Sequence, residues 1–187
     1  MTGTTALMTA TEVAVARRPG PLWQEPTWDL FPPAGEALAS VVRQPGGSLK
    51  PGEHLRYVVA GADGATIWLM DRSAAGKVSR FLVDHHGTFL GEVLQENVLF
   101  APQFRMIDAA GATLRLANAR AGSYEWTVQD LAGQPLGSVT RVRSPDPEAF
   151  EMRRYRVERG DGLGGELWPL VLLSAVCLDI VHDRARR

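Results

Sequence analysis

The chain has 187 residues, of which 45% are apolar and 22% charged, a size and composition typical of a single domain with a sizeable core. Its formal net charge of −1 argues against a general nucleic-acid-binding protein, which would carry a large basic excess. Cys177 is the single cysteine, so an internal disulfide is excluded and a reducing compartment is favoured. Arginine outnumbers lysine heavily and alanine and glycine are abundant, which indicates a bacterial coding bias.

The first 33 residues predict a flexible N-terminal arm, and residues 34–184 predict the folded domain. The arm is rich in threonine, alanine, proline and glycine and shows little hydrophobic periodicity. Its aromatic residues Trp23, Trp28 and Phe31 are expected to pin its end onto the domain. A secretory signal is not expected, because no basic start is followed by a long apolar stretch.

The middle of the chain predicts a series of antiparallel hairpins. Residues 37–43 are compatible with a short strand or a short helix. From residue 55 onward, one unit has a strand, an Asp-Gly turn and a strand, and three further units share the template strand, Asp-x-x-Gly, strand. Each aspartate should accept a bond from the backbone two residues on, and each glycine should take a positive φ. The three units carry Asp84 and Gly87, Asp108 and Gly111, and Asp130 and Gly133. A last strand is expected at Met152–Glu158.

The most informative segment is the last one, Leu167–Val181, which is apolar on every side of a helix. Its uncharged part lies between Glu166 and Asp179, whereas a bilayer span needs about 20 apolar residues. The segment could be the buried centre of the fold, a C-terminal membrane anchor or an ordinary packed helix. Hairpins without exposed edges require closure, and a closed barrel needs an interior filler. We therefore predict a mainly β fold, a closed antiparallel barrel of roughly 10–12 strands wrapped around a C-terminal helix at 167–184.

An ordered set of motifs runs through the hairpins and the final helix. V-D-x-x-G-x-x-L-G-x-V is followed by P-x-F-x-x-x-D-x-x-G, by V-x-D-x-x-G-x-x-L-G-x-V and by an apolar helix with an internal aspartate. The matching residues are Val83, Asp84, Gly87, Leu90, Gly91, Glu92, Val93, Pro102, Phe104, Asp108, Gly111, Val128, Asp130, Gly133, Leu136, Gly137, Ser138 and Val139, with the helix end Cys177–Asp183. On these residues, from Leu55 to Asp183, the chain resembles the phospholipid scramblase and LURP-one-related family, which has the tubby C-terminal-like fold.

The resemblance implies a closed antiparallel barrel of about twelve strands around the terminal helix, and an association with phospholipids. The chain departs from the family in its functional motifs. It lacks the cysteine cluster that is palmitoylated in eukaryotic scramblases, and the basic phosphoinositide site of tubby proteins does not map onto it. Residues 158–166, which correspond to an acidic calcium-binding segment, hold too few carboxylates for the roughly six to eight oxygen ligands of calcium. We expect neither a metal nor a cofactor.

The arginines between positions 141 and 159 are the main candidate binding residues. One interpretation is a solvated rim, in which these arginines pair with the acidic residues among them. The other is a site for an anionic lipid headgroup, because guanidinium groups bind phosphate through two parallel hydrogen bonds. The candidates for that site are Arg141, Arg143, Arg153, Arg154 and Arg156.

No set of residues predicts catalysis. His85 and His86 are adjacent in a turn, where their side chains point in different directions, so two solvated histidines are favoured over a metal site. His182 follows Asp179 by three residues on one helical face, which favours pairing or capping over a catalytic role. Cys177 is expected to be a small buried hydrophobic residue. No serine lies in a nucleophile-elbow context.

We therefore expect a non-enzymatic, scramblase-like domain that binds a lipid, an anionic headgroup or a protein partner at or near the membrane. The alternative is a membrane-inserted phospholipid scramblase that uses residues 167–181 as its span. We expect a cytoplasmic location with peripheral association at the inner face of the plasma membrane, and no nucleic-acid partner.

Overall fold

The computed structural model describes residues 3–18, 26–46, 54–75, 78–96, 102–120, 123–142 and 154–184. In these ranges the chain forms two helices and twelve strands. In chain order they are α1 (Gly3–Thr9), β1 (Glu12–Arg17), β2 (Thr27–Phe31), β3 (Ala39–Arg43), β4 (Leu55–Gly61), β5 (Thr66–Ala75), β6 (Val78–His85), β7 (Thr88–Gln95), β8 (Phe104–Asp108), β9 (Thr113–Asn118), β10 (Glu125–Gln129), β11 (Pro135–Val142), β12 (Arg154–Arg159) and α2 (Trp168–Arg184).

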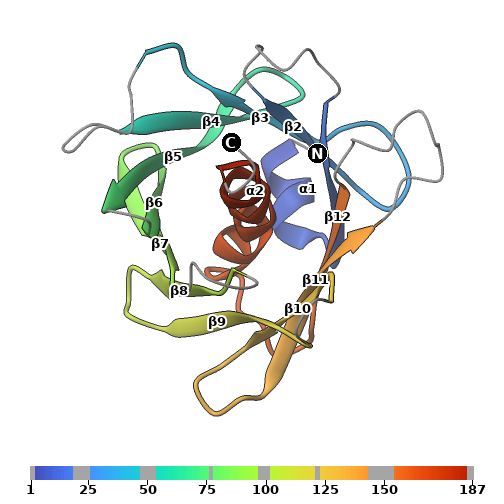
Figure 1. Cartoon of the computed structure of the whole chain (residues 1–187). Coiled ribbons are helices and arrows are strands. Elements are labelled where there is room, and N and C mark those ends of the chain that lie inside the picture. The colour runs from blue at the N-terminus through green and yellow to red at the C-terminus, as the bar shows by residue number, and fades with distance from the viewer. Residues whose placement is uncertain are drawn as a thin grey trace.

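The strands form one closed antiparallel barrel, which confirms the predicted fold class. Each strand pairs with its neighbours in the sequence, and β1 closes the ring by pairing with β12. Figure 1 shows this ring with α2 running through it. We call the end at which α2 begins the base of the barrel, and the end at which α2 finishes the top. Odd-numbered strands run from base to top, and even-numbered strands return.

The barrel wall shows the alternation that a closed sheet with a filled interior requires. In β4 the burial pattern alternates strictly, with Leu55, Tyr57 and Val59 inside the barrel and Arg56 fully outside. In β12 Tyr155 and Val157 are buried between exposed arginines. Neighbouring strands repeat the pattern in register, so their inward side chains form one continuous core.

Helix α2 fills the interior, which confirms the predicted buried helix. Every residue from Leu170 to Asp179 is completely inaccessible to solvent. Because the helix is apolar on every side, none of its faces needs contact with water, and the barrel can pack against it in every direction. The observed bounds, Trp168–Arg184, differ from the predicted 167–184 by one residue.

The N-terminal segment differs from the expected flexible arm, because most of it belongs to the barrel. Strand β1 places Val13 and Val15 in the core, and β2 places Trp28 and Leu30 there. These strands join β12 to β3 and thereby close the ring. Trp28 contributes its whole ring to the core, which goes beyond the expected pinning of an arm; Trp23 lies outside the described residues.

Three hairpin turns share one geometry. In the β8–β9 turn, the N–H of Gly111 donates to Asp108 O at 3.1 Å, and the N–H of Asp108 donates to Ala112 O at 3.0 Å. Gly111 then has a φ of +90°, as a type I turn followed by a left-handed residue requires. The turns at β4–β5 and β10–β11 have the same two bonds. The predicted positive φ is confirmed at glycines 87, 111 and 133.

The aspartates act over a longer span than expected. Asp108 Oδ1 accepts from the N–H of Ala112 at 2.8 Å, four residues on, and Asp130 does the same with Gln134. The β6–β7 turn is different, because His86 and Gly87 both have positive φ, which is typical of a tighter two-residue hairpin. The shared template therefore covers two turn types that the sequence does not distinguish.

The repeated Leu-Gly pairs of the hairpin motif have a structural role beyond the turn. Gly91 pairs with Val83 where the β6–β7 register shifts, and Gly137 pairs with Val128 at the equivalent shift in β10–β11. A Cβ on Gly91 would lie 2.3 Å from Ile107 O and 2.8 Å from Leu170 Cδ1. Glycine at this position therefore lets both the next strand and α2 approach the backbone of β7.

The buried helix predicts a severe effect of charge in its centre. We expect Leu173→Asp to prevent folding, because an unpaired carboxylate would replace a fully buried side chain. The control Leu173→Met conserves volume and should cost less than about 1.5 kcal/mol of unfolding free energy. Circular dichroism and urea unfolding measure both variants. A soluble Leu173→Asp variant with an unchanged spectrum and cooperative unfolding would contradict the position of α2.

The turn geometry predicts a backbone effect at Gly111, where an added Cβ would meet nothing within 4 Å. We expect Gly111→Val to cost about 1–3 kcal/mol, because valine strongly disfavours a φ of +90°. Gly111→Asn should cost less, since asparagine tolerates the left-handed region. Thermal unfolding measures the difference. Equal melting temperatures for the wild-type protein and Gly111→Val would show that positive φ is not the constraint.

Candidate functional site

The described members of the predicted arginine cluster, Arg141, Arg154 and Arg156, lie on β11 and β12, but they do not share one face. Arg154 and Arg156 point outward from β12, on either side of the buried Tyr155. Arg141 is opposite Tyr155 and lies on the inward-facing register of β11, half-buried at the top. Its guanidinium carbon lies 5.1 Å from the ring centre of Tyr124, and the side chain of Tyr124 is half-exposed to solvent. Arg143 and Arg153 lie outside the described residues.

Arg156 fits the solvated, salt-bridged interpretation. Its Nε lies 3.4 Å from Oε1 of Glu158, which follows it by two positions on the same outward register of β12. The other oxygen of that carboxylate accepts a hydrogen bond of 2.7 Å from Ser138 Oγ on β11. Arg156 is therefore part of a local polar network on the barrel wall.

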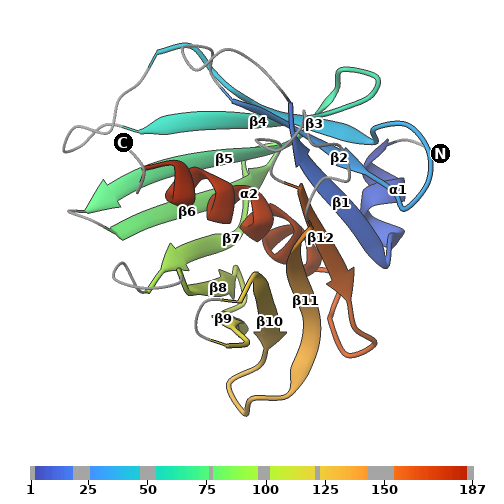
Figure 2. The same cartoon turned by 45° about the vertical axis from the view of Figure 1, so that its right-hand side comes forward.

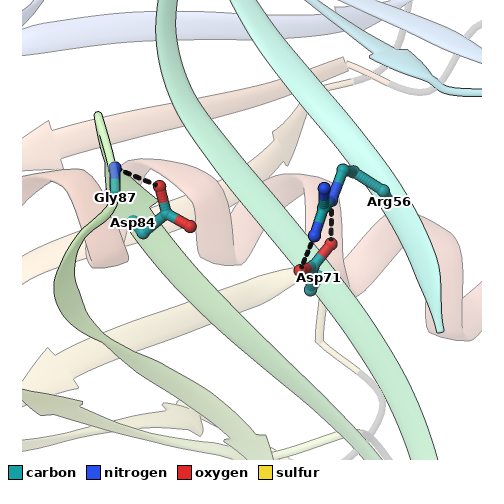
Figure 3. A network of polar contacts seen from close by, with 4 residues as sticks. All are labelled: Arg56, Asp71, Asp84 and Gly87. Carbon is teal, nitrogen blue, oxygen red and sulfur yellow. Dashed lines mark hydrogen bonds and ion pairs between the residues drawn. The ribbon is translucent and has the colours of Figure 1, made fainter.

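The same kind of pairing recurs around the wall. Arg56 on β4 donates from Nε and Nη2 to the two carboxylate oxygens of Asp71 on β5, both at 2.7 Å (Figure 3). The hydrogen bond and charge of Asp71 raise the pKa of Arg56 above its ordinary value. Further ion pairs of the wall are Arg18–Asp29, Arg80–Glu92, Arg105–Glu96 and Arg115–Glu96. The charge of each of these arginines is compensated by a nearby carboxylate.

Three arginines at the top differ from this pattern, and we call them the rim arginines: Arg120, Arg141 and Arg154. None of them forms an ion pair with a carboxylate of the described residues. Arg120 follows β9 by two residues, Arg141 is the second-last residue of β11, and Arg154 is the first residue of β12. These are three of four neighbouring strands whose ends meet at the top. Glu125, exposed at the start of β10, is the carboxylate beside them in the strand order. Counting only the described residues, the rim arginines therefore outnumber the carboxylates beside them.

Apolar side chains are exposed beside the rim arginines. Val142 is directly opposite Arg154 in the β11–β12 register and is 41% exposed. Tyr124, under Arg141, is 50% exposed. This part of the top therefore combines the guanidinium groups of the rim arginines with exposed apolar surface.

Arg120 was not among the predicted binding residues, because it is more than twenty residues from the arginine cluster in the sequence. The signal that could have identified it is its position just after a strand that ends at the top.

A second polar group at the top is buried and structural. Asp179 is completely buried in α2, and its Oδ2 accepts a hydrogen bond of 3.0 Å from Trp28 Nε1 on β2. Arg17 Nη1 on β1 lies 3.6 Å from the same oxygen and 3.1 Å from Asp183 Oδ1. Asp179 and Asp183 are four residues apart and so share one helical face. Two strands of the barrel thus recognise the last turns of α2.

His85 and His86 were expected to point in different directions, but their rings lie side by side in the structure. His85 Nδ1 lies 2.5 Å from Ile67 O, and its ring centre is 4.3 Å from that of His86. His182 contacts Trp126, with the two rings 6.1 Å apart in an edge-on arrangement. Within the described part of the chain, no group of three or more His, Cys, Asp or Glu residues could hold a metal ion. Cys177 is buried beside Met70, and desolvation raises the pKa of its thiol, which therefore stays protonated.

Comparison with models of known protein families, with curated proteins and with solved structures finds no match to this chain. The site is therefore interpreted from its own geometry.

No helix in the described residues has the length and the apolar character needed to cross a membrane.

The buried aspartate predicts unequal effects for two neighbouring carboxylates. Asp179→Ala removes the acceptor of Trp28 Nε1 inside the core, so we expect a loss of about 2–4 kcal/mol of unfolding free energy. Asp183→Ala should cost no more than about 1 kcal/mol, because this carboxylate is partly exposed. Urea unfolding at neutral pH compares them. Equal costs would show that Asp179 is not the residue that fixes α2 to β1 and β2.

Proposed function

We propose that the protein is a non-enzymatic, scramblase-like binding domain whose rim arginines recognise the anionic headgroups of a membrane surface. The observation that carries the proposal is the contrast between the paired wall arginines and the rim arginines. Wall arginines such as Arg56, Arg80 and Arg115 are paired with carboxylates, whereas no ion pair joins the rim arginines to a carboxylate of the described residues. Guanidinium groups that are not paired with a described carboxylate would be available to phosphate, which they bind with two parallel hydrogen bonds.

The side chains beside the rim arginines support a membrane rather than a dissolved anion as the source of phosphate. Tyrosine is favoured at membrane interfaces, where its ring meets acyl chains and its hydroxyl meets water. Tyr124 and Val142 would lie at that depth when the top of the barrel faces a bilayer. Each arginine near an anionic surface contributes about 1 kcal/mol, so the three rim arginines would give a reversible, salt-sensitive association.

The proposal extends the family resemblance, whose expected architecture is a closed barrel around a terminal helix. A cytoplasmic protein that associates peripherally with the inner, anionic face of the plasma membrane would fit these features. The alternative of a scramblase inserted through residues 167–181 is less well supported, because that helix is enclosed by the barrel wall. Withdrawing the helix would leave the interior of the barrel unfilled.

The test is flotation of the purified protein with vesicles of phosphatidylglycerol and phosphatidylcholine. The variant carries Arg120→Gln, Arg141→Gln and Arg154→Gln, and we expect it to lose most of its binding while keeping its circular dichroism spectrum. The control carries Arg56→Gln, Arg80→Gln and Arg115→Gln, which removes the same charge from paired positions and should leave binding nearly unchanged. Wild-type binding should weaken with added salt, since exposed charges are screened over about 8 Å at physiological ionic strength.

Two results would contradict the proposal. Equal losses in both triple variants would show that net charge alone drives binding and that the rim arginines have no special role. Absence of wild-type flotation at low salt would exclude anionic membranes and favour a protein partner instead. Vesicles of pure phosphatidylcholine control for apolar adsorption through Tyr124 and Val142.

A further inference from the structure

Helix α1 occupies the base of the barrel, at the opposite end from the rim arginines. Figures 1 and 2 show it beside the first part of α2 and against β1 and β12. Leu7 is completely buried in the core. The carbonyl of Leu7 accepts a hydrogen bond of 2.8 Å from Trp168 Nε1, at the first residue of α2. The short N-terminal helix therefore covers the start of the central helix.

A second donor holds the end of α1. Arg159 Nη1, at the end of β12, donates to Met8 O at 3.1 Å. Carbonyls in the last turn of a helix have no partner within the helix, and a cation there is favoured by the helix dipole. Trp168 and Arg159 thus satisfy two carbonyls that α1 by itself would leave to water. Together with the burial of Leu7, these two bonds attach α1 to the barrel.

Arg159 and Trp168, which supply the two donors, also have contacts outside α1. Arg159 Nε and Nη2 both donate to Leu163 O, at 3.1 and 3.0 Å. Its guanidinium carbon lies 5.8 Å from the ring centre of Trp168. Arg159, Leu163 and Trp168 therefore form a preformed receptor within the loop that connects β12 to α2. This receptor would survive the departure of α1.

Helix α1 has little stability of its own. It has seven residues and carries no acidic residue in its first turn and no basic residue in its last. Isolated helices shorter than about 12–15 residues are marginal in water, so its folding depends on the barrel contacts. Segments held by few contacts open locally at a lower free energy than the whole protein. The barrel wall, in contrast, has paired strands all round the ring.

We infer that α1 is a latch that closes the base of the barrel and opens as a unit while the barrel stays folded. Opening withdraws Leu7 from the core and uncovers the indole N–H of Trp168 and Nη1 of Arg159. The latch therefore controls access to the start of α2. This inference does not rest on the proposed function, because the receptor at the base and the rim arginines at the top share no residue.

The experiment is native-state hydrogen exchange of the full chain, read residue by residue by NMR. In the wild-type protein, the protected amides of α1 and the following residue, up to Ala10, should exchange at least about tenfold faster than the amides of β7 and α2. Trp168→Phe keeps an aromatic ring but removes the donor to Leu7 O. It should speed exchange in α1 by about tenfold more, because a buried carbonyl loses its partner.

The matched control is Trp126→Phe. Trp126 is equally buried, and its Nε1 donates 3.1 Å to a backbone carbonyl, that of Pro102, between β7 and β8. Trp126→Phe should leave the ratio of exchange rates between the amides of α1 and those of the barrel unchanged. Should α1 of the wild-type protein exchange only at the rate of global unfolding, the latch is excluded, and this holds even if a variant fails to fold. Equal acceleration of α1 by both variants would likewise overturn it.

Discussion

A closed barrel has no edge strands, but it encloses a volume that must be filled, and this constraint governs the rest of the structure. Helix α2 meets it with side chains that are apolar in every direction. Apolar contacts are not directional, so they fix the rotation and depth of the helix only through side-chain shape, and Asp179 adds a directional contact. Its carboxylate is buried and has to be satisfied, which Trp28 and Arg17 do from two adjacent strands. One polar residue thus fixes the position of an otherwise featureless helix.

The wall adapts to the helix through glycine and through small irregularities of register. Gly91 allows β8 and α2 to approach β7 at distances that a side chain would prevent. The equivalent Gly137 lies against the backbone of β12, where a Cβ would meet Glu158 O at 2.5 Å. Both glycines follow a leucine in the repeated motif and sit at a register shift. The motif therefore describes how a hairpin bends around a central helix, in addition to how it turns.

The two ends of the barrel are finished in different ways. At the base, α1 covers the start of α2, and the side-chain donors of Trp168 and Arg159 bind carbonyls of α1. At the top, the charges of Asp179 and Asp183 are matched by Arg17, while Arg120, Arg141 and Arg154 have no such match among the described carboxylates. Among the described residues, ion pairs thus join several wall arginines and the end of α2 to carboxylates, and the rim arginines lack such pairs.

Features that depend on neighbouring residues followed from the sequence alone, and features that depend on distant ones did not. Asp-x-x-Gly determined the positive φ at Gly111 and Gly133, because a turn is made by its own four or five residues. The all-round apolar helix and the need for closure were sufficient to predict the barrel class.

Strands β1 and β2 were not predicted from the sequence, because they are short, lie among prolines and are stabilised by pairing with β12 and β3. Likewise, only the register of β11 and β12 separates Arg141 from Arg154, and only the meander brings Arg120 to the same rim. The pairing of Asp179 with Trp28 joins residues 151 positions apart, which no local pattern encodes, because it exists only once the ring has closed around the helix.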